Sequence, residues 1–257
     1  MRAFAAVLAG VSGLAFGSFM SVVVHRVPKK ESIVAPRSRC PNCGHQLAAL
    51  DNIPIVSWLM LGGKCRYCKA PVSPRYLAAE VLTALVWVLA VVRLPLGWGL
   101  LAYLPFLWVL VCLSLIDLET KLLPNAIVYP SLIAGVPLLA VVTALAGVPW
   151  SAWIRGIEGM VVGAGVFFVI ALIYPAGMGM GDVKFAGLIG LFVGYASWSY
   201  LVAAFFLAFL TGAIVGVLLM VGGKAGRKTA IPFGPFMALG AILAVLFGDP
   251  IVRLYRG

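Results

Sequence analysis

Charged residues are scarce in this sequence. Only 11% of its 257 residues are Asp, Glu, Lys or Arg, whereas 63% are hydrophobic, and the mean hydropathy is +1.10. No soluble core of this length needs so much apolar surface, so the composition excludes a soluble globular protein. It favours a protein whose chain crosses a membrane many times.

Several catalytic patterns are also missing. The two histidines, His25 and His45, both lie at or beyond the end of the first apolar run, and no serine lies in a nucleophile-elbow motif. A serine or cysteine triad would therefore have to recruit one of these histidines across the membrane interface. The pattern H-E-x-x-H is absent, which disfavours a metalloprotease. Carboxylates are the catalytic groups that remain.

Long apolar runs predict an all-α polytopic membrane protein with about eight transmembrane helices, since a span needs about 20 residues. A smaller number, about six or seven, stays open because glycine, proline or shortness blurs the sixth and eighth runs. A dense cationic stretch follows the first run where a signal peptide would have its cleavage site, so we expect that run to be a retained span. The predicted spans are Phe4–Val24, Tyr76–Val92, Trp98–Ile116, Ala126–Val148, Ile157–Tyr174, Phe185–Trp198, Leu201–Val221 and Ile231–Phe247.

The distribution of lysine and arginine predicts the orientation. With eight spans, 14 of the 19 cations fall on one side, which is therefore cytoplasmic, and both termini lie outside. This bias accounts for the net charge of +11, so we expect membrane lipid and not nucleic acid as a partner. The 14 cations are Arg26, Lys29, Lys30, Arg37, Arg39, Lys64, Arg66, Lys69, Arg75, Lys121, Lys184, Lys224, Arg227 and Lys228.

One long polar segment, residues 25–75, holds four of the five cysteines in two C-x-x-C pairs that are 21 residues apart. This spacing is typical of a structural Zn²⁺ site with four thiolate ligands, whose binding energy would fold so short a segment. Disulfides are the alternative, but the predicted side of the membrane is reducing. We expect His45 to be a neighbour and not a ligand, and Cys112 to be a small buried hydrophobe. The predicted ligands are Cys40, Cys43, Cys65 and Cys68.

Two of the eight acidic residues stand out: Asp117 at the end of the third span, and Asp182, which ends the stretch GMGMGD. In the predicted topology both lie at the cytoplasmic rim of the hydrocarbon, where an ionised carboxylate costs about 2.5–3.5 kcal/mol. Two close carboxyls cannot both ionise, so they would share one proton and one could activate water, as in aspartyl proteolysis. The glycines would let backbones approach and would weaken the helix beside a scissile peptide bond.

Other interpretations of these aspartates stay open. A lone aspartate at the end of a span is commonly a helix-terminal residue. A transporter or channel could use an unwound glycine segment to bind ions, but it predicts internal repeats, and we find no convincing correspondence between the two halves. A membrane anchor whose cysteine module binds a partner predicts that both aspartates tolerate alanine.

Taken together, the motifs resemble the type IV prepilin peptidases, the prepilin leader peptidase/N-methyltransferase family of membrane aspartyl proteases with a G-x-G-D motif. The resemblance runs through almost the whole chain. Besides the two C-x-x-C pairs, it is carried by Phe16–Phe19, Arg26–Pro28, Asp51–Pro54, Ser57–Leu59, Gly63–Cys68, Arg75–Tyr76 with Glu80, Ile116–Leu118, Leu123–Pro124, Gly177–Lys184 and Ile231–Phe236.

The resemblance implies a bacterial inner-membrane enzyme with two activities. It would cleave the basic leader from type IV prepilins and type II secretion pseudopilins at the cytoplasmic face, with Asp117 and Asp182 as the catalytic pair. It would also methylate the new N-terminal amine with S-adenosylmethionine. The implied parts are a first transmembrane helix over 1–24, a cytoplasmic four-cysteine module over 25–75 and a membrane-embedded helical peptidase domain over 76–257.

The methyltransferase activity rests on the complete N-terminal module, because the sequence has no glycine-rich nucleotide-binding loop after a strand. Two positions depart from the family: asparagine is usual at Ser21, and tyrosine or a similar residue is common near His25. The candidate for the methyl-donor site is Glu80. Two other interpretations of Glu80 stay open: its carboxylate pairs with Arg75, or its side chain faces lipid.

Overall fold

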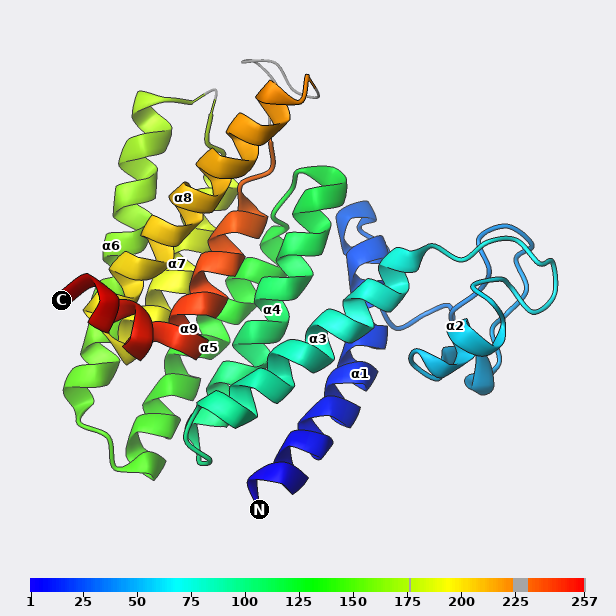
Figure 1. Ribbon diagram of the computed structural model, residues 1–257, viewed down its shortest axis with the longest axis horizontal. Helices are drawn as coiled ribbons and strands as arrows, with labels where there is room; N and C mark the ends of the chain where they lie inside the picture. The colour runs from blue at the N-terminus through cyan, green and yellow to red at the C-terminus, as the bar shows by residue number, and fades with distance from the viewer. Residues whose placement is uncertain (176, 224–230, 257) are drawn as a thin grey trace. The chain divides into compact units, whose positions relative to one another are not determined.

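The computed structural model describes residues 1–175, 177–223 and 231–256 (Figure 1). These residues are mostly α-helical and contain no β-strand, only two isolated bridges. They form two compact units, Met1–Val92 and Arg93–Gly257. The prediction of an all-α protein is confirmed.

Seven helices in the described residues are long and apolar enough to cross a membrane. The predicted span Phe185–Trp198 corresponds to α7 (Met180–Ala196), which has 17 residues and is therefore shorter than the usual span. Most of its side chains are buried inside the second unit, so its apolar character serves packing between helices. The seven longer helices are α1 (Arg2–Arg26), α3 (Pro74–Arg93), α4 (Gly99–Thr120), α5 (Asn125–Ala146), α6 (Trp150–Ile173), α8 (Trp198–Val221) and α9 (Gly234–Arg256).

In the first unit, α1 and α3 approach until their backbones touch. An ideal Cβ on Gly13 would lie 2.7 Å from Cα of Ala84, and one on Gly17 would lie 2.5 Å from Cα of Glu80. Small residues permit this approach, which brings the polar atoms of one helix within reach of the other. The polar segment between the two helices contains the 3₁₀ turns η1 (Val27–Lys29) and η2 (Ala49–Asn52) and the short helix α2 (Val56–Met60).

In the second unit, α6 and α7 pack through two matched sets of glycines. An ideal Cβ on Gly159 would lie 3.1 Å from Cα of Gly194, and one on Gly163 would lie 2.7 Å from the carbonyl oxygen of Ala186. This close packing holds α7 in the interior of the unit. The glycines are Gly156, Gly159 and Gly163 on α6, and Gly187, Gly190 and Gly194 on α7.

The start of α6 differs from the prediction, because the helix begins at Trp150 and not at Ile157. The charged Arg155 would be costly in hydrocarbon, which is why the predicted span excluded it. In the structure its guanidinium donates to the carbonyl oxygens of Gly194 at 2.9 Å and Tyr195 at 2.6 Å, at the end of α7. A basic side chain there satisfies carbonyls that a helix end leaves without partners.

Candidate active site

Asp117 lies in the last turn of α4 and is only 5% exposed. Its Oδ2 accepts a hydrogen bond of 2.9 Å from the backbone N–H of Gly234, the first residue of α9. Helix α4 ends directly afterwards at Lys121, which takes a left-handed backbone conformation with φ of 54°. The carboxyl therefore faces the N-terminus of α9, where the positive end of the helix dipole stabilises a negative charge.

Gly234 leaves no room for a side chain. An ideal Cβ at this position would lie 2.7 Å from Oδ2 of Asp117 and 3.3 Å from Cδ2 of Leu123. The sequence motif Ile231–Phe236 contains this glycine, but sequence reasoning gave it no role. The sequence contains one signal that could have pointed to Gly234: it directly precedes Pro235, and proline commonly begins a helix.

Asp182 is the third residue of α7, and its Oδ2 accepts a hydrogen bond of 3.0 Å from the backbone N–H of Gly179. The stretch GMGMGD is thus divided: residues 177–179 precede the helix, and Met180 begins it. The predicted span began later, at Phe185, because a carboxylate is unfavourable in hydrocarbon. In the structure the same carboxylate stabilises the helix N-terminus by capping it.

The two aspartates lie where the ends of three helices meet. An ideal Cβ on Gly181 would lie 3.1 Å from Cβ of Leu123, and Leu123 also touches the position of Gly234. Helix α9 packs against both α4 and α7. The charges of Asp182 and Lys121 both act on the carboxyl of Asp117. The structure therefore brings Asp117 and Asp182 into one electrostatic environment, while their catalytic role stays a prediction.

Lys184 fixes the start of α7 against α5. Its Nζ donates to Oδ1 of Asn125 at 3.0 Å and lies 5.1 Å from the ring centre of Tyr129. Asn125 is the first residue of α5, so this contact links two helix starts. We infer that the lysine of the motif Gly177–Lys184 orients the segment that holds Asp182.

The four predicted cysteine ligands form one cluster. Their sulfur atoms all lie within 4.8 Å of one another, none is in a disulfide, and Sγ of Cys40 lies 3.8 Å from Sγ of Cys68. A tetrahedron of thiolates with Zn–S bonds of about 2.3 Å has edges of about 3.8 Å, so the cluster fits such an ion. The ring of His45 packs against that of Tyr67, tilted by 34° with the ring centres 3.5 Å apart, and His45 is not among the cluster residues.

The two cysteine pairs repeat one backbone geometry. The N–H of Cys40 donates to the carbonyl oxygen of His45 at 2.9 Å, and the N–H of Cys65 donates to that of Ala70 at 2.8 Å. The residue that follows each pair, Gly44 or Lys69, has a positive φ, of 71° or 58°. The same turn therefore presents both pairs of sulfur atoms.

Hydrogen bonds lower the pKa of two thiols of the cluster, Cys40 and Cys68. Hydrogen bonds from the backbone at Ala70 and from the side chain of Asn42 lower the pKa of Cys68 to about 6. A thiolate is the form that binds metal ions. The fifth cysteine, Cys112, is completely buried in α4, as expected for a small hydrophobe.

Glu80, the candidate for the methyl-donor site, is buried on α3 with an exposed fraction of 8%. Its Oε2 accepts a hydrogen bond of 2.7 Å from the backbone N–H of Ile55, and the side chain of Ser18 also bonds to the carboxyl. The side chain therefore does not face lipid. Its contacts lie on α1 and in the polar segment, both within the first unit.

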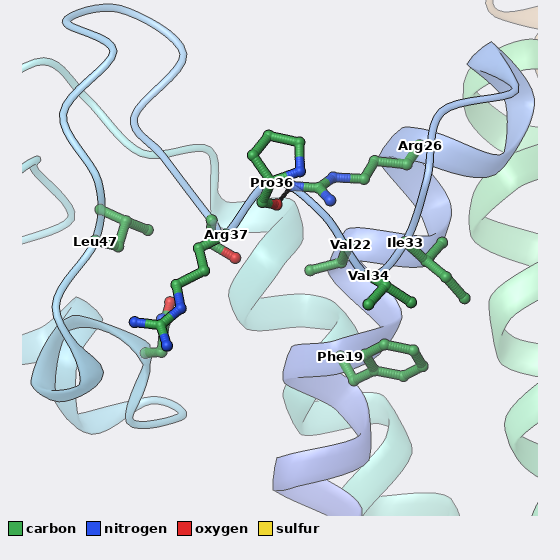
Figure 2. A pocket seen from close by; sticks show the side chains of 10 residues that line it. Phe19, Val22, Arg26, Ile33, Val34, Pro36, Arg37 and Leu47 are labelled. Carbon is green, nitrogen blue, oxygen red and sulfur yellow. Dashed lines mark hydrogen bonds between the residues drawn. The ribbon is translucent and has the colours of Figure 1, made fainter.

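A hollow of about 470 Å³ lies beside the end of α1 (Figure 2). The guanidinium of Arg26 reaches across from α1 and donates to the carbonyl oxygens of Ser32 at 2.8 Å and Pro36 at 2.7 Å. The arginine of the motif Arg26–Pro28 thus shapes the loop that forms one wall. The lining residues are Phe19, Val22, Arg26, Ile33, Val34, Pro36, Arg37, Ser38, Leu47 and Asn52.

Comparison with known proteins places both units in described families. Residues 11–94 match the Bacterial Peptidase A24 N-terminal domain, and residues 104–217 match the Type IV leader peptidase family. No solved structure matches the chain.

Curated relatives cover nearly the whole chain. It is 37% identical to the prepilin leader peptidase/N-methyltransferase of Aeromonas hydrophila, over 94% of this chain and 90% of that protein. It is 36% identical to the protein of the same name from Pseudomonas aeruginosa, over 95% of this chain and 90% of that protein. The corresponding protein of Bacillus subtilis (strain 168) is 36% identical over 95% of each chain.

Proposed function

This chain belongs to the type IV leader peptidase family, and on that premise we propose that it cleaves the basic leader from prepilins and pseudopilins and then methylates the new N-terminus. The proposal assigns the cleavage to Asp117 and Asp182. The observation that supports it is that both residues lie where the ends of α4, α7 and α9 meet, and that each carboxyl accepts a backbone N–H there. The transporter alternative is not favoured, because relatives over 94% of the chain are named as peptidases.

Cleavage begins with a pair of carboxyls that shares one proton. Oδ2 of Asp117 accepts from the backbone N–H of Gly234, and the carboxyl of Asp182 accepts from the backbone N–H groups of Gly179 and of Asp182 itself. A carboxylate has about four lone-pair sites, so both carboxyls keep acceptor capacity for the reaction. The ionised carboxyl takes a proton from water as the water oxygen attacks the scissile carbonyl carbon, and the protonated carboxyl donates to the carbonyl oxygen. The carboxyl that took the proton from water then gives it to the leaving amine as the C–N bond breaks, and the hydroxyl on the former carbonyl carbon returns its proton to the other carboxyl. The pair titrates as a unit, so base and acid are roles within the pair.

The N-terminal unit supports the second activity, the methylation of the released amine. When bound, S-adenosylmethionine would supply the methyl group. The four thiolates would hold a structural Zn²⁺, since a site with four cysteine ligands leaves no open position for a reacting water. The metal would then stabilise the polar segment, whose own core is small.

We further propose that α7, with 17 residues, crosses the membrane as an eighth, short span. The cysteine module and both aspartates then lie on the cytoplasmic side of the bacterial inner membrane, with the termini outside. The support is the excess of Lys and Arg on the segments that would face the cytoplasm. Three of these cations, Lys224, Arg227 and Lys228, lie outside the described residues.

Mass spectrometry of a co-expressed prepilin tests both activities in one measurement. The expected product has lost its leader and carries one added methyl group at its N-terminus. Asp117→Asn or Asp182→Asn should leave the leader attached at normal levels of the enzyme. If either variant still cleaves at the wild-type rate, the assignment to this pair is wrong.

A further inference from the structure

The backbone at Ile55 is strained in an unusual way. Its φ is 61° and its ψ is −52°, and the N–H of Val56 donates to the carbonyl oxygen of Pro54 at 2.6 Å. This is a three-residue turn with positive φ, which is rare and strained. For a β-branched residue such a φ is a genuine outlier, and it persists only where the surroundings impose it.

The N–H at the centre of this turn is bonded to the carboxylate of Glu80. Its Oε2 accepts the N–H of Ile55 at 2.7 Å, the length expected when the acceptor is charged. The position of Glu80 is itself fixed, because its Cα lies against Gly17 of α1 and Ser18 bonds to its carboxyl. The turn is therefore bonded to a closely packed pair of helices.

The turn lies in the middle of a segment that joins the helices to the cysteine cluster. We call residues 51–60 the strap. At its beginning, Oδ1 of Asp51 accepts from Nε of Arg66 at 2.7 Å, and Arg66 lies between Cys65 and Cys68 in the second cysteine pair. The strap is thus bonded to the second cysteine pair at Asp51 and to helix α3 at Ile55.

We propose that Glu80 is a positioning residue for methyl transfer: by holding the strained turn at Ile55, it fixes the strap between the cysteine cluster and the helices α1 and α3. The inference rests on the proposed methyltransferase activity of the first unit. It gives this carboxylate a role apart from peptide cleavage, because its contacts lie within residues 1–92 whereas Asp117 and Asp182 lie in the second unit. Strained residues cluster at functional sites, where the strain is part of the mechanism.

The test uses the full-length protein in detergent with a prepilin substrate and S-adenosylmethionine. Glu80→Gln keeps an oxygen that can accept the N–H of Ile55, whereas Glu80→Ala removes it. Adding Ile55→Gly to Glu80→Ala should restore the turn, because glycine adopts positive φ without steric cost. Thr83→Val is the matched control, since Thr83 is also buried on α3 and its hydroxyl bonds to Ala79 and Met20, both in the first unit.

The first readout is hydrogen exchange at the amide of Ile55. We expect exchange at least tenfold faster in Glu80→Ala, and within threefold of wild type in Glu80→Gln and in Thr83→Val. The second readout is the kinetics of methylation of a cleaved pilin. We expect kcat at least tenfold lower in Glu80→Ala, little change of KM for S-adenosylmethionine, and recovery to within threefold of wild type in the double variant. Peptide cleavage should stay within twofold of wild type in every variant.

Three results would overturn the inference. Unchanged exchange at Ile55 in Glu80→Ala would mean that the carboxylate does not hold the turn. Equal loss of methylation in Glu80→Gln and Glu80→Ala, without recovery on adding Ile55→Gly, would assign Glu80 a chemical role through its charge. A parallel loss of cleavage would indicate general misfolding. If the wild-type enzyme itself yields unmethylated pilin, the proposed methyltransferase activity fails, and the exchange data still decide whether Glu80 holds the turn.

Discussion

Both units of this protein bury a carboxylate on a long apolar helix and hold it with a backbone N–H from a distant segment. In the first unit Glu80 accepts from Ile55 at 2.7 Å, and in the second Asp117 accepts from Gly234 at 2.9 Å. The two carboxyls differ in the charge of the other groups near them. The charge of Asp182 acts on Asp117, whereas the groups bonded to Glu80 are neutral donors.

The comparison shows how one local arrangement can serve two purposes. A buried carboxylate beside a second carboxyl must share a proton, which suits it to acid–base chemistry. A buried carboxylate that meets only neutral donors gains charge-assisted hydrogen bonds and fixes the backbone that donates them. Glycines let helices pack closely in both units, and the first unit contains the cysteine cluster as well.

The largest effect is expected when the second unit loses either aspartate. Asp117→Asn or Asp182→Asn should lower the rate of prepilin cleavage by about 10²–10⁴, the usual contribution of a general acid or base. Methylation of a pilin that has already been cleaved should stay near the wild-type rate. Glu119→Gln is the control, because Glu119 lies at the same helix end but is exposed. Equal loss of both activities would contradict the division of labour between the units.

Removal of the metal should affect the first unit alone. Cys65→Ser, or a strong chelator, should abolish zinc binding and expose residues 25–75 to limited proteolysis, because the proposed Zn²⁺ would supply the folding energy of this segment. Methylation should be lost while cleavage persists. Metal analysis, a proteolysis time course and the mass of the pilin N-terminus measure these effects. An enzyme that methylates normally after complete zinc removal would rule out the structural role.

A single methyl group placed beside Asp117 should slow cleavage by a smaller factor. In Gly234→Ala the new Cβ would lie 2.7 Å from Oδ2 of Asp117, so the carboxyl must move. A shift of about 1 Å in a catalytic group can cost about 10²-fold in rate, so we expect a decrease of about 10- to 100-fold in kcat. Gly165→Ala on α6 is the control, because no atom lies within 4 Å of its added Cβ. Similar activity in the two variants would argue against a role for close packing at Gly234.

The smallest effect is expected in the turns after the cysteine pairs. Gly44→Ala forces a side chain into a conformation with φ of 71°, which should destabilise the turn by about 1 kcal/mol. The opposite change, Lys69→Gly, removes the steric cost of a φ of 58° in the folded state but raises the backbone entropy of the unfolded chain. Because these two contributions partly cancel, the net change in the stability of the turn should be smaller. The chelator concentration that removes half of the zinc should fall about fivefold in Gly44→Ala. A larger effect of Lys69→Gly than of Gly44→Ala would contradict the equivalence of the two turns.

Many features of the molecule could be predicted from the residue types and their spacing along the chain. The apolar runs identify the membrane helices, since a span is a local property of about 20 residues. The four cysteines are recognised by their spacing, and Asp117 and Asp182 are conspicuous because acids are unfavourable at the edge of hydrocarbon. Each of these inferences needs only the residue types and their near neighbours.

The tertiary structure alone decided which distant groups touch. It assigned Gly234 to the carboxyl of Asp117, 117 positions away, and Ile55 to Glu80, 25 positions away. It also placed α7 inside its unit and began that helix at Met180, before the predicted start. The sequence indicates that burying a carboxylate is unfavourable, but it does not show which backbone N–H bonds to that carboxylate. The partner is determined only when the helices pack against one another.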